Sequence, residues 1–184
     1  MSKETILQSI RANKPAGIGC PFPRNVGTAT TVENVVETFV GNTKAAGGEV
    51  VEWKDGISKD YPNALDFTDE EVRKMFSAST PMATLDKIEC AVFEGAFGVA
   101  ENGAIWIEDK DLPHRIIPFI TQRLILKLNA SNIVPTMQEA YSRIRLNDTG
   151  FGVFISGPSK TADIEQSLVY GAHGAVKVTV LLIQ

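Results

Sequence analysis

The residues best suited to chemistry lie in one stretch near the end of the 184-residue chain, residues 152–174. This stretch reads GVFISGPSKTADIEQSLVYGAHG: a short apolar run, a polar turn, and then a helical pattern over 162–170. The first N–H groups of a helix have no partner inside the helix, and the helix dipole is positive at that end. A strand that leads through such a turn into a helix therefore predicts an anion-binding site.

The side chains of the turn add to this prediction. Ser159 or Thr161 can cap the predicted helix, and Lys160 supplies a mobile positive charge. Asp163 falls in the first helical turn, where the dipole favours a carboxylate, and it can point into the polar turn. The pair Gly157–Pro158 shapes the backbone. The alternative is a strand-to-helix turn in which these residues only cap and shape the chain.

Two further residues could handle protons. Glu101 follows a glycine-bearing apolar run and precedes the turn Asn102–Gly103 into a strand. A closed pocket would raise the pKa of this carboxyl by desolvation and make it a candidate base or nucleophile; a solvated turn residue is the alternative. His173 lies between two glycines before the last strand, as a proton shuttle or as a structural residue.

Several familiar sites are excluded by their missing motifs. The chain has no GxxxxGK[ST], no GxGxxG and no GxSxG, which argues against the standard ATP and NAD loops and the hydrolase elbow. Its two cysteines, Cys20 and Cys90, and its two histidines form no CxxC or HExxH spacing. We therefore expect no metal site. Cys90 lies in an apolar run and is predicted to be a core residue.

Composition limits the partners and the compartment. The net charge is −4, with acidic and basic residues interspersed, which disfavours nucleic acid as a partner. No run approaches the roughly 18 apolar residues of a membrane span, and the N-terminus lacks an apolar signal core, so the cytoplasm is the expected compartment. The length predicts a single α/β domain over 1–184, in which residues 1–30 form a helix-and-loop extension.

Hydrophobic periodicity predicts the elements that must position these residues. The predicted helices cover 2–12, a segment capped by Thr30 that ends near Ala46, 69–76 capped by Thr68, and 135–144. The predicted strands cover 49–53, 104–107, 116–117, 124–126, 153–155 and 175–182, and the apolar run 88–93 begins the denser part of the chain. This alternation predicts a mostly parallel sheet flanked by helices. Ligands gather at the carboxyl ends of such strands, so residues 157–161, which follow a strand, are expected at that edge.

The stretch GPSKTADIEQSLVYGAHG resembles the C-terminal signature of the LUD domain, the family of lactate utilisation protein C. That signature has GPS-[RK]-T-A-D-I-E followed by G-x-H-G. The segment GVAENGAIWIE resembles the family's acidic turn, although Asn102-Gly103-Ala104 replaces the usual TGT. Lys160 stands where arginine is common in the family. An arginine guanidinium could make a planar bidentate contact, whereas the lysine ammonium offers only a point charge. Residues 88–184 match best.

The resemblance implies a fold like that of the sugar-phosphate isomerases and coenzyme A transferases. It also implies an accessory role in oxidising L-lactate to pyruvate, with iron–sulfur clusters in partner subunits and no cofactor bound by this chain. Glu101 and His173 would be the catalytic candidates of a small electropositive cup. The ligand-binding candidates are Asn102, Gly103, Gly157, Pro158, Ser159, Lys160, Thr161 and Asp163.

Two other functions stay open. Glu101-Asn102-Gly103 resembles the ENG motif around the glutamate nucleophile of class I coenzyme A transferases, although Ala100 replaces the motif's serine. A free-standing acyl- or coenzyme A transferase-like enzyme would use Glu101 in this way. The other alternative is a regulatory module that binds a ligand without catalysis. The ligand, catalysis itself and the formation of homo-oligomers are left open by the sequence.

Overall fold

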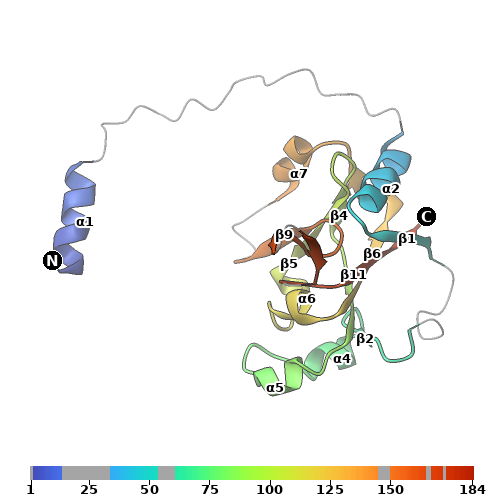
Figure 1. Cartoon of the computed structure of the whole chain (residues 1–184), viewed down its shortest axis with the longest axis horizontal. Coiled ribbons are helices and arrows are strands. Elements are labelled where there is room, and N and C mark those ends of the chain that lie inside the picture. Colours follow the sequence, from blue (N-terminus) through green and yellow to red (C-terminus); the bar gives the residue numbers. More distant parts are fainter. Residues whose placement is uncertain (1, 14–33, 54–60, 145–149, 165–166, 172) are drawn as a thin grey trace. The chain divides into compact units, whose positions relative to one another are not determined.

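The computed structural model describes residues 2–13, 34–53, 61–144, 150–164, 167–171 and 173–184 (Figure 1). The chain divides into two compact units, Met1–Thr30 and Thr31–Gln184. In the first unit, helix α1 (Lys3–Ala12) begins where the Ser2 hydroxyl accepts the N–H of Thr5, which confirms the predicted first helix. Cys20 and the predicted cap Thr30 lie outside the described residues.

The second unit is built on a five-stranded, fully parallel sheet, which confirms the predicted fold class. Its strands in spatial order are β1 (Glu49–Glu52), β11 (Lys177–Ile183), β6 (Arg123–Asn129), β3 (Cys90–Glu94) and β2 (Leu65–Asp66). The long apolar runs of β6 and β11 occupy its centre, because central parallel strands are covered on both faces.

A second, four-stranded sheet carries the predicted strands 104–107 and 153–155. Its order is β7 (Ile133–Val134), β4 (Phe97–Val99), β5 (Ala104–Glu108) and β8 (Gly152–Ile155). The pairs β4–β5 and β5–β8 are antiparallel. The strand predicted at 153–155 therefore exists, but it does not belong to the parallel sheet. The turn between β4 and β5 holds Gly103 at φ +66°, which suits the predicted Asn-Gly turn.

The longer predicted helices are confirmed, with changes at their ends. Helix α2 (Val35–Ala45) is capped by Asn34, whose side chain accepts the N–H of Glu37. Helix α4 (Glu70–Lys74) is capped by Asp69 and not by Thr68 as predicted, and α7 (Met137–Arg143) begins at its cap Thr136. The remaining short elements are α5 (Met82–Leu85), α6 (Ile117–Ile120), η1 (Asp109–Asp111) and η2 (Ala130–Asn132).

The strand predicted at 116–117 is wrong. Ile117 begins α6, and Pro118 lies in its first turn, where proline's fixed φ and missing N–H suit a helix start.

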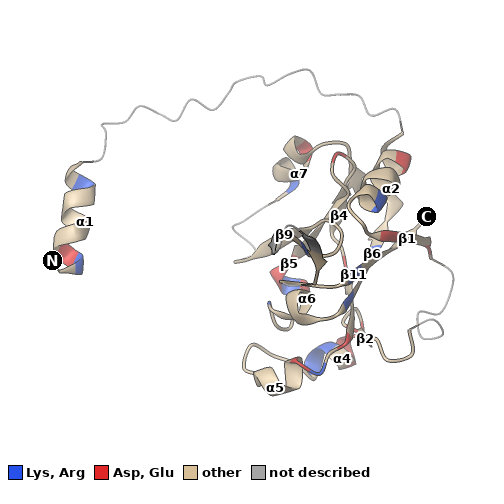
Figure 2. Ribbon diagram, viewed as in Figure 1, with Lys and Arg blue, Asp and Glu red and all other residues tan. Residues whose placement is uncertain are grey.

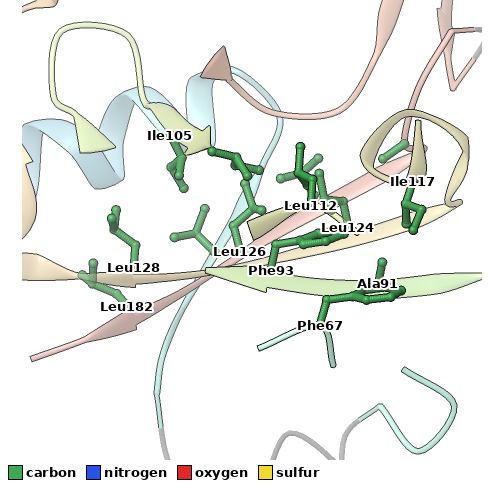
Figure 3. Close-up of a cluster of buried hydrophobic side chains, with 14 of the residues drawn as sticks. Phe67, Ala91, Phe93, Ile105, Leu112, Ile117, Leu124, Leu126, Leu128 and Leu182 are labelled. Carbon is green, nitrogen blue, oxygen red and sulfur yellow. The ribbon is translucent and has the colours of Figure 1, made fainter. Parts of the chain in front are cut away.

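The core lies between the two sheets. Leu124, Leu126 and Leu128 project from β6 toward the layer that contains Ile105 (Figure 3). Phe39 of α2 belongs to the same cluster and is fully buried. The opposite face of the parallel sheet carries a smaller cluster of Cys90, Val92, Ile125 and Leu181, against which Trp53 and Tyr61 pack. Cys90 is thus a buried residue, as predicted.

The helix predicted over 162–170 is wrong. The chain forms an antiparallel hairpin there, of β9 (Lys160–Ile164) and β10 (Ser167–Tyr170), in which Lys160 pairs with Tyr170. Thr161, Ile164, Val169 and Tyr170 are β-branched or aromatic, and such residues favour a pleated strand once a partner strand is available. The helix N-terminus that was to bind an anion does not form.

Charged residues of both signs are spread over the described helices and strands (Figure 2). One pair lies on the parallel sheet: the Lys127 ammonium donates to Asp66 over 2.8 Å and to the Thr68 hydroxyl over 2.8 Å. Burial alone would raise the pKa of Asp66, but the hydrogen bonds from Lys127 and Thr68 outweigh it and hold that pKa below its usual value. The ionised form of Asp66 therefore stabilises the fold.

Replacing Lys127 with methionine should lower the free energy of unfolding by about 1–3 kcal/mol near pH 7, because a half-buried carboxylate loses its charged donor. The folded pKa of Asp66 is depressed, so its contribution is present above the unfolded pKa and is lost as pH falls through the folded one. Urea titrations should show a smaller difference between the two proteins at about pH 3 than near pH 7. A difference that does not change with pH would contradict the role assigned to Asp66.

Candidate functional site

A cavity of about 240 Å³ is lined by residues from both ends of the segment 156–175. The turn Ser156–Ser159 forms one side, and His173–Ala175 forms another. Its other lining residues come from α6, β6, β8 and β11: Pro118, Phe119, Leu124, Phe154, Ile155 and Val178. Four of the predicted site residues therefore line one cavity: Gly157, Pro158, Ser159 and His173.

Ser159 holds the two halves together. Its N–H donates to the carbonyl of Ala175 over 2.9 Å, and its carbonyl accepts the N–H of Gly171 over 3.0 Å. Its hydroxyl accepts the N–H of His173 over 3.4 Å. The predicted capping role of Ser159 is therefore replaced by a different one, in which all three polar groups of the residue fix the loop that carries His173.

Gly157 brings the turn against the end of helix α2. Its φ is +64°, and a Cβ there would overlap the carbonyl oxygen of Ala46 and lie 2.9 Å from the Ala46 carbonyl carbon. Next to this contact, the side chain of Lys160 lies over Gly47, with Cε 3.2 Å from the position that a Cβ of Gly47 would take. The Lys160 ammonium thus lies beside the C-terminal end of α2, where the helix dipole is negative. It does not line the cavity.

The turn Glu101–Gly103 lies next to this site and is fixed from two sides. The Ser156 hydroxyl donates to the carbonyl of Asn102 over 2.7 Å. From α2, the Asn42 amide donates to the carbonyls of Ala100 and Glu101, over 2.7 and 3.1 Å. The Asn102 side chain accepts the N–H of Ala104 and so shapes the turn itself.

The carboxylate of Glu101 is directed to helix α7 and not to the cavity. It is exposed, and it accepts the N–H of Met137, the first residue of α7, over 2.8 Å. That N–H is one of those without a partner inside the helix, and a negative charge suits this helix end. Glu101 therefore serves as a second cap of α7 beside Thr136.

Replacing Glu101 with alanine should lower the free energy of unfolding by about 0.5–2 kcal/mol, the usual cost of a lost cap. Glu101→Gln is the matched control, because its amide oxygen can still accept the Met137 N–H while the charge is lost. Denaturant unfolding should place Glu101→Gln between Glu101→Ala and the unmodified protein. Equal stability of all three proteins would contradict the capping role.

Two predicted ligand residues lie in the hairpin. Thr161 is in β9 and pairs with Val169 of β10, so it caps no helix. Asp163 also belongs to β9, and its side chain lies outside the described residues. The predicted cup is thus brought together only in part: the polar turn and His173 meet, whereas Glu101 and Lys160 are directed elsewhere.

The sequence predicts the site at the carboxyl ends of the parallel strands, but the cavity lies at their amino ends. Its two residues from the parallel sheet, Leu124 and Val178, are each the second residue of their strand. The prediction was wrong because β8, which leads into the turn, pairs antiparallel with β5 in the other sheet. Pro118 and Phe119 form an apolar wall of the cavity that the sequence did not predict. Their only sequence feature is hydrophobicity, which does not distinguish a residue that lines a cavity from one in the core.

No group of His, Cys, Asp and Glu suited to a metal ion is present among the residues that the structure describes. None of the described helices is both long and apolar enough to cross a membrane.

Comparisons with known proteins extend over almost the whole chain. The model of the LUD domain family matches residues 4–183. A protein of Geobacillus sp. (strain WCH70) called lactate utilization protein C is 27% identical over 198 residues, which cover 99% of this chain and 79% of the relative. One of the same name from Macrococcus caseolyticus (strain JCSC5402) is 25% identical and covers 100% of this chain and 80% of its own length.

A solved structure shows the same fold. It is the crystal structure of a DUF162 family protein from Deinococcus radiodurans, with a TM-score of 0.56 and 15% sequence identity. The match covers 82% of this chain and 96% of that protein. At this identity the similarity concerns the fold alone.

Proposed function

This chain belongs to the LUD domain family, and on that premise we propose that it is an accessory protein in the oxidation of L-lactate to pyruvate. The relatives called lactate utilization protein C support a role in lactate utilisation. We propose that the redox cofactors, iron–sulfur clusters, belong to partner subunits. This chain would contribute a ligand site.

The cavity between the turn Gly157–Ser159 and His173 is the proposed ligand site. The observation that carries this proposal is that both halves of the family motif line one cavity and are joined through Ser159. At about 240 Å³ the cavity is smaller than the roughly 300–1,000 Å³ that hold drug-sized ligands, which favours a small molecule. Its apolar wall includes Phe119 and Leu124, and its polar side chains are those of Ser156, Ser159 and His173.

A small carboxylate with a short apolar body would match a cavity that has both an apolar wall and polar side chains. We propose that the Ser159 hydroxyl and the backbone N–H of Gly157 receive the carboxylate, and that the exposed His173 imidazole accepts or donates a proton. Glu101 would act as a positioning residue. Its carboxylate fixes α7, and the same turn holds Ser156 through the carbonyl of Asn102.

Growth on L-lactate tests the pathway. A bacterial strain that lacks its own lactate utilization protein C is given this gene, with L-lactate as the sole carbon source. We expect the unmodified gene to restore growth and His173→Asn to restore much less, whereas Ser131→Ala, an exposed change outside the cavity, should match the unmodified gene. Failure of the unmodified, expressed protein to restore growth would overturn the proposed role.

One observation favours the non-catalytic alternative over the transferase. A glutamate nucleophile must face its substrate, but the Glu101 carboxylate is bonded to the N–H of Met137. We therefore expect no thioester on Glu101 when the protein is incubated with acyl-coenzyme A, as measured by mass spectrometry. A trapped Glu101 thioester would establish the transferase instead. If growth survives His173→Asn while binding of L-lactate or pyruvate is lost, the site is regulatory.

A further inference from the structure

A second cavity, of about 250 Å³, lies at the same edge of the parallel sheet and carries two positive charges. Its lining residues are Glu89, Cys90, Gln122, Arg123, Val176 and Lys177. It is separate from the first cavity, which takes Leu124 and Val178 from the same strands. Successive residues of a strand point to opposite faces, so the two cavities lie on opposite faces of the sheet.

The two cations lie side by side by virtue of strand register. Arg123 pairs with Lys177 across β6 and β11, and with Cys90 across β6 and β3. The first residues of three neighbouring strands thus form a row on one face, with strands about 4.8 Å apart. The row carries a thiol, a guanidinium and an ammonium group in that order.

Neither cation is neutralised by a carboxylate that the structure describes. The ion pairs among the described residues include neither Arg123 nor Lys177. Glu89 also lines the cavity, which leaves one net positive charge. Like charges on directly neighbouring strand positions repel each other, so this row is destabilising without an anion between them.

The row is also held in place. The Arg123 guanidinium lies over the ring of Tyr61, with Cζ 5.3 Å from the ring centroid, and the Arg123 N–H donates to the carbonyl of Glu89 over 2.9 Å. The N–H groups of Val176 and Lys177 both donate to the carbonyl of Gln122, over 2.9 and 3.1 Å, which fixes the start of β11. A fixed guanidinium beside an ammonium matches the oxygens of a tetrahedral dianion.

We propose that this row binds a phosphate-type oxyanion, between Arg123 and Lys177, in a site distinct from the carboxylate cavity. The guanidinium would donate two hydrogen bonds, and the ammonium would balance the second negative charge. The Gln122 side chain would supply a neutral donor from the cavity wall. This proposal does not depend on the role in lactate utilisation.

Calorimetric titration of the full chain with inorganic phosphate tests the site, with sodium chloride at equal ionic strength as the reference. We expect saturable phosphate binding, and a Kd at least about tenfold weaker in Lys177→Gln, which removes an exposed side chain and therefore leaves folding intact. Arg123→Lys keeps the positive charge but loses the paired N–H donors of the guanidinium, and we expect a similar weakening of phosphate binding. Lys3→Gln on α1 removes the same charge and should bind as the unmodified protein does.

Three results would overturn the proposal. The first is a Kd for Lys177→Gln equal to that of Lys3→Gln. The second is a chloride reference that gives the same heat as phosphate. The third is loss of phosphate binding in Ser159→Ala, because this variant alters only the first cavity and would place the anion there.

Discussion

Replacing Phe39 with alanine is expected to lower the free energy of unfolding by about 3–5 kcal/mol, the range for removing a buried aromatic side chain. Phe39 is fully buried, and with Thr43 it is one of the two buried residues of helix α2. The helix is the element that supports the Glu101 turn through Asn42 and contacts Gly157 through Ala46. Loss of its anchor should therefore loosen both sides of the site.

Denaturant unfolding followed by circular dichroism measures this effect. Phe119→Ala is the matched control, because Phe119 is 37% exposed and loses less buried area. We expect the control to be at least about 1 kcal/mol less destabilised than Phe39→Ala. Equal destabilisation of the two variants would show that α2 is not anchored through Phe39.

Replacing Gly157 with alanine is expected to cost about 2–4 kcal/mol, in two parts. An L-residue at φ +64° costs roughly 1–2 kcal/mol, and the overlap of its Cβ with the Ala46 carbonyl adds an overpacking cost of similar size. The overlapping atoms belong to backbone, so they cannot turn away as a flexible side chain could. The midpoint of thermal unfolding should fall by about 4–16 °C.

Gly41→Ala is the matched control, with an expected effect of opposite sign. Gly41 lies within α2, and nothing lies within 4 Å of the position that its Cβ would take. Alanine is about 1 kcal/mol more favourable than glycine in a helix interior, so this variant should be more stable. If both variants shift the midpoint in the same direction, the close approach of the turn to α2 is not what requires glycine at 157.

Much of the framework was predictable from residues near one another in the chain. Apolar runs such as 124–126 favour central strands, which are buried on both faces, and the predicted parallel sheet with β6 and β11 is confirmed. Val35, Val36 and Phe39 recur at helical spacing, and all three lie in helix α2 as that spacing predicts. The family was recognised from a contiguous motif, which the match over residues 4–183 confirms.

The hairpin was not predictable in the same way. Residues 160–170 have a pattern that is compatible with a helix, and the choice depends on a partner that can pair with them. Here β10 pairs with β9, and Ser159 closes the pair through Gly171. Strand formation depends more on such neighbours than helix formation does, because each strand's hydrogen bonds are made to another segment.

The sequence by itself determined the family, the parallel sheet, the main helices and the polar turn that belongs with His173, since each depends on local pattern or a contiguous motif. Only the tertiary structure decided where the side chains point: Glu101 to Met137, Lys160 over Gly47, and Arg123 beside Lys177. These contacts join segments far apart in the chain. Strand order and register set them, and neither is encoded within a single segment.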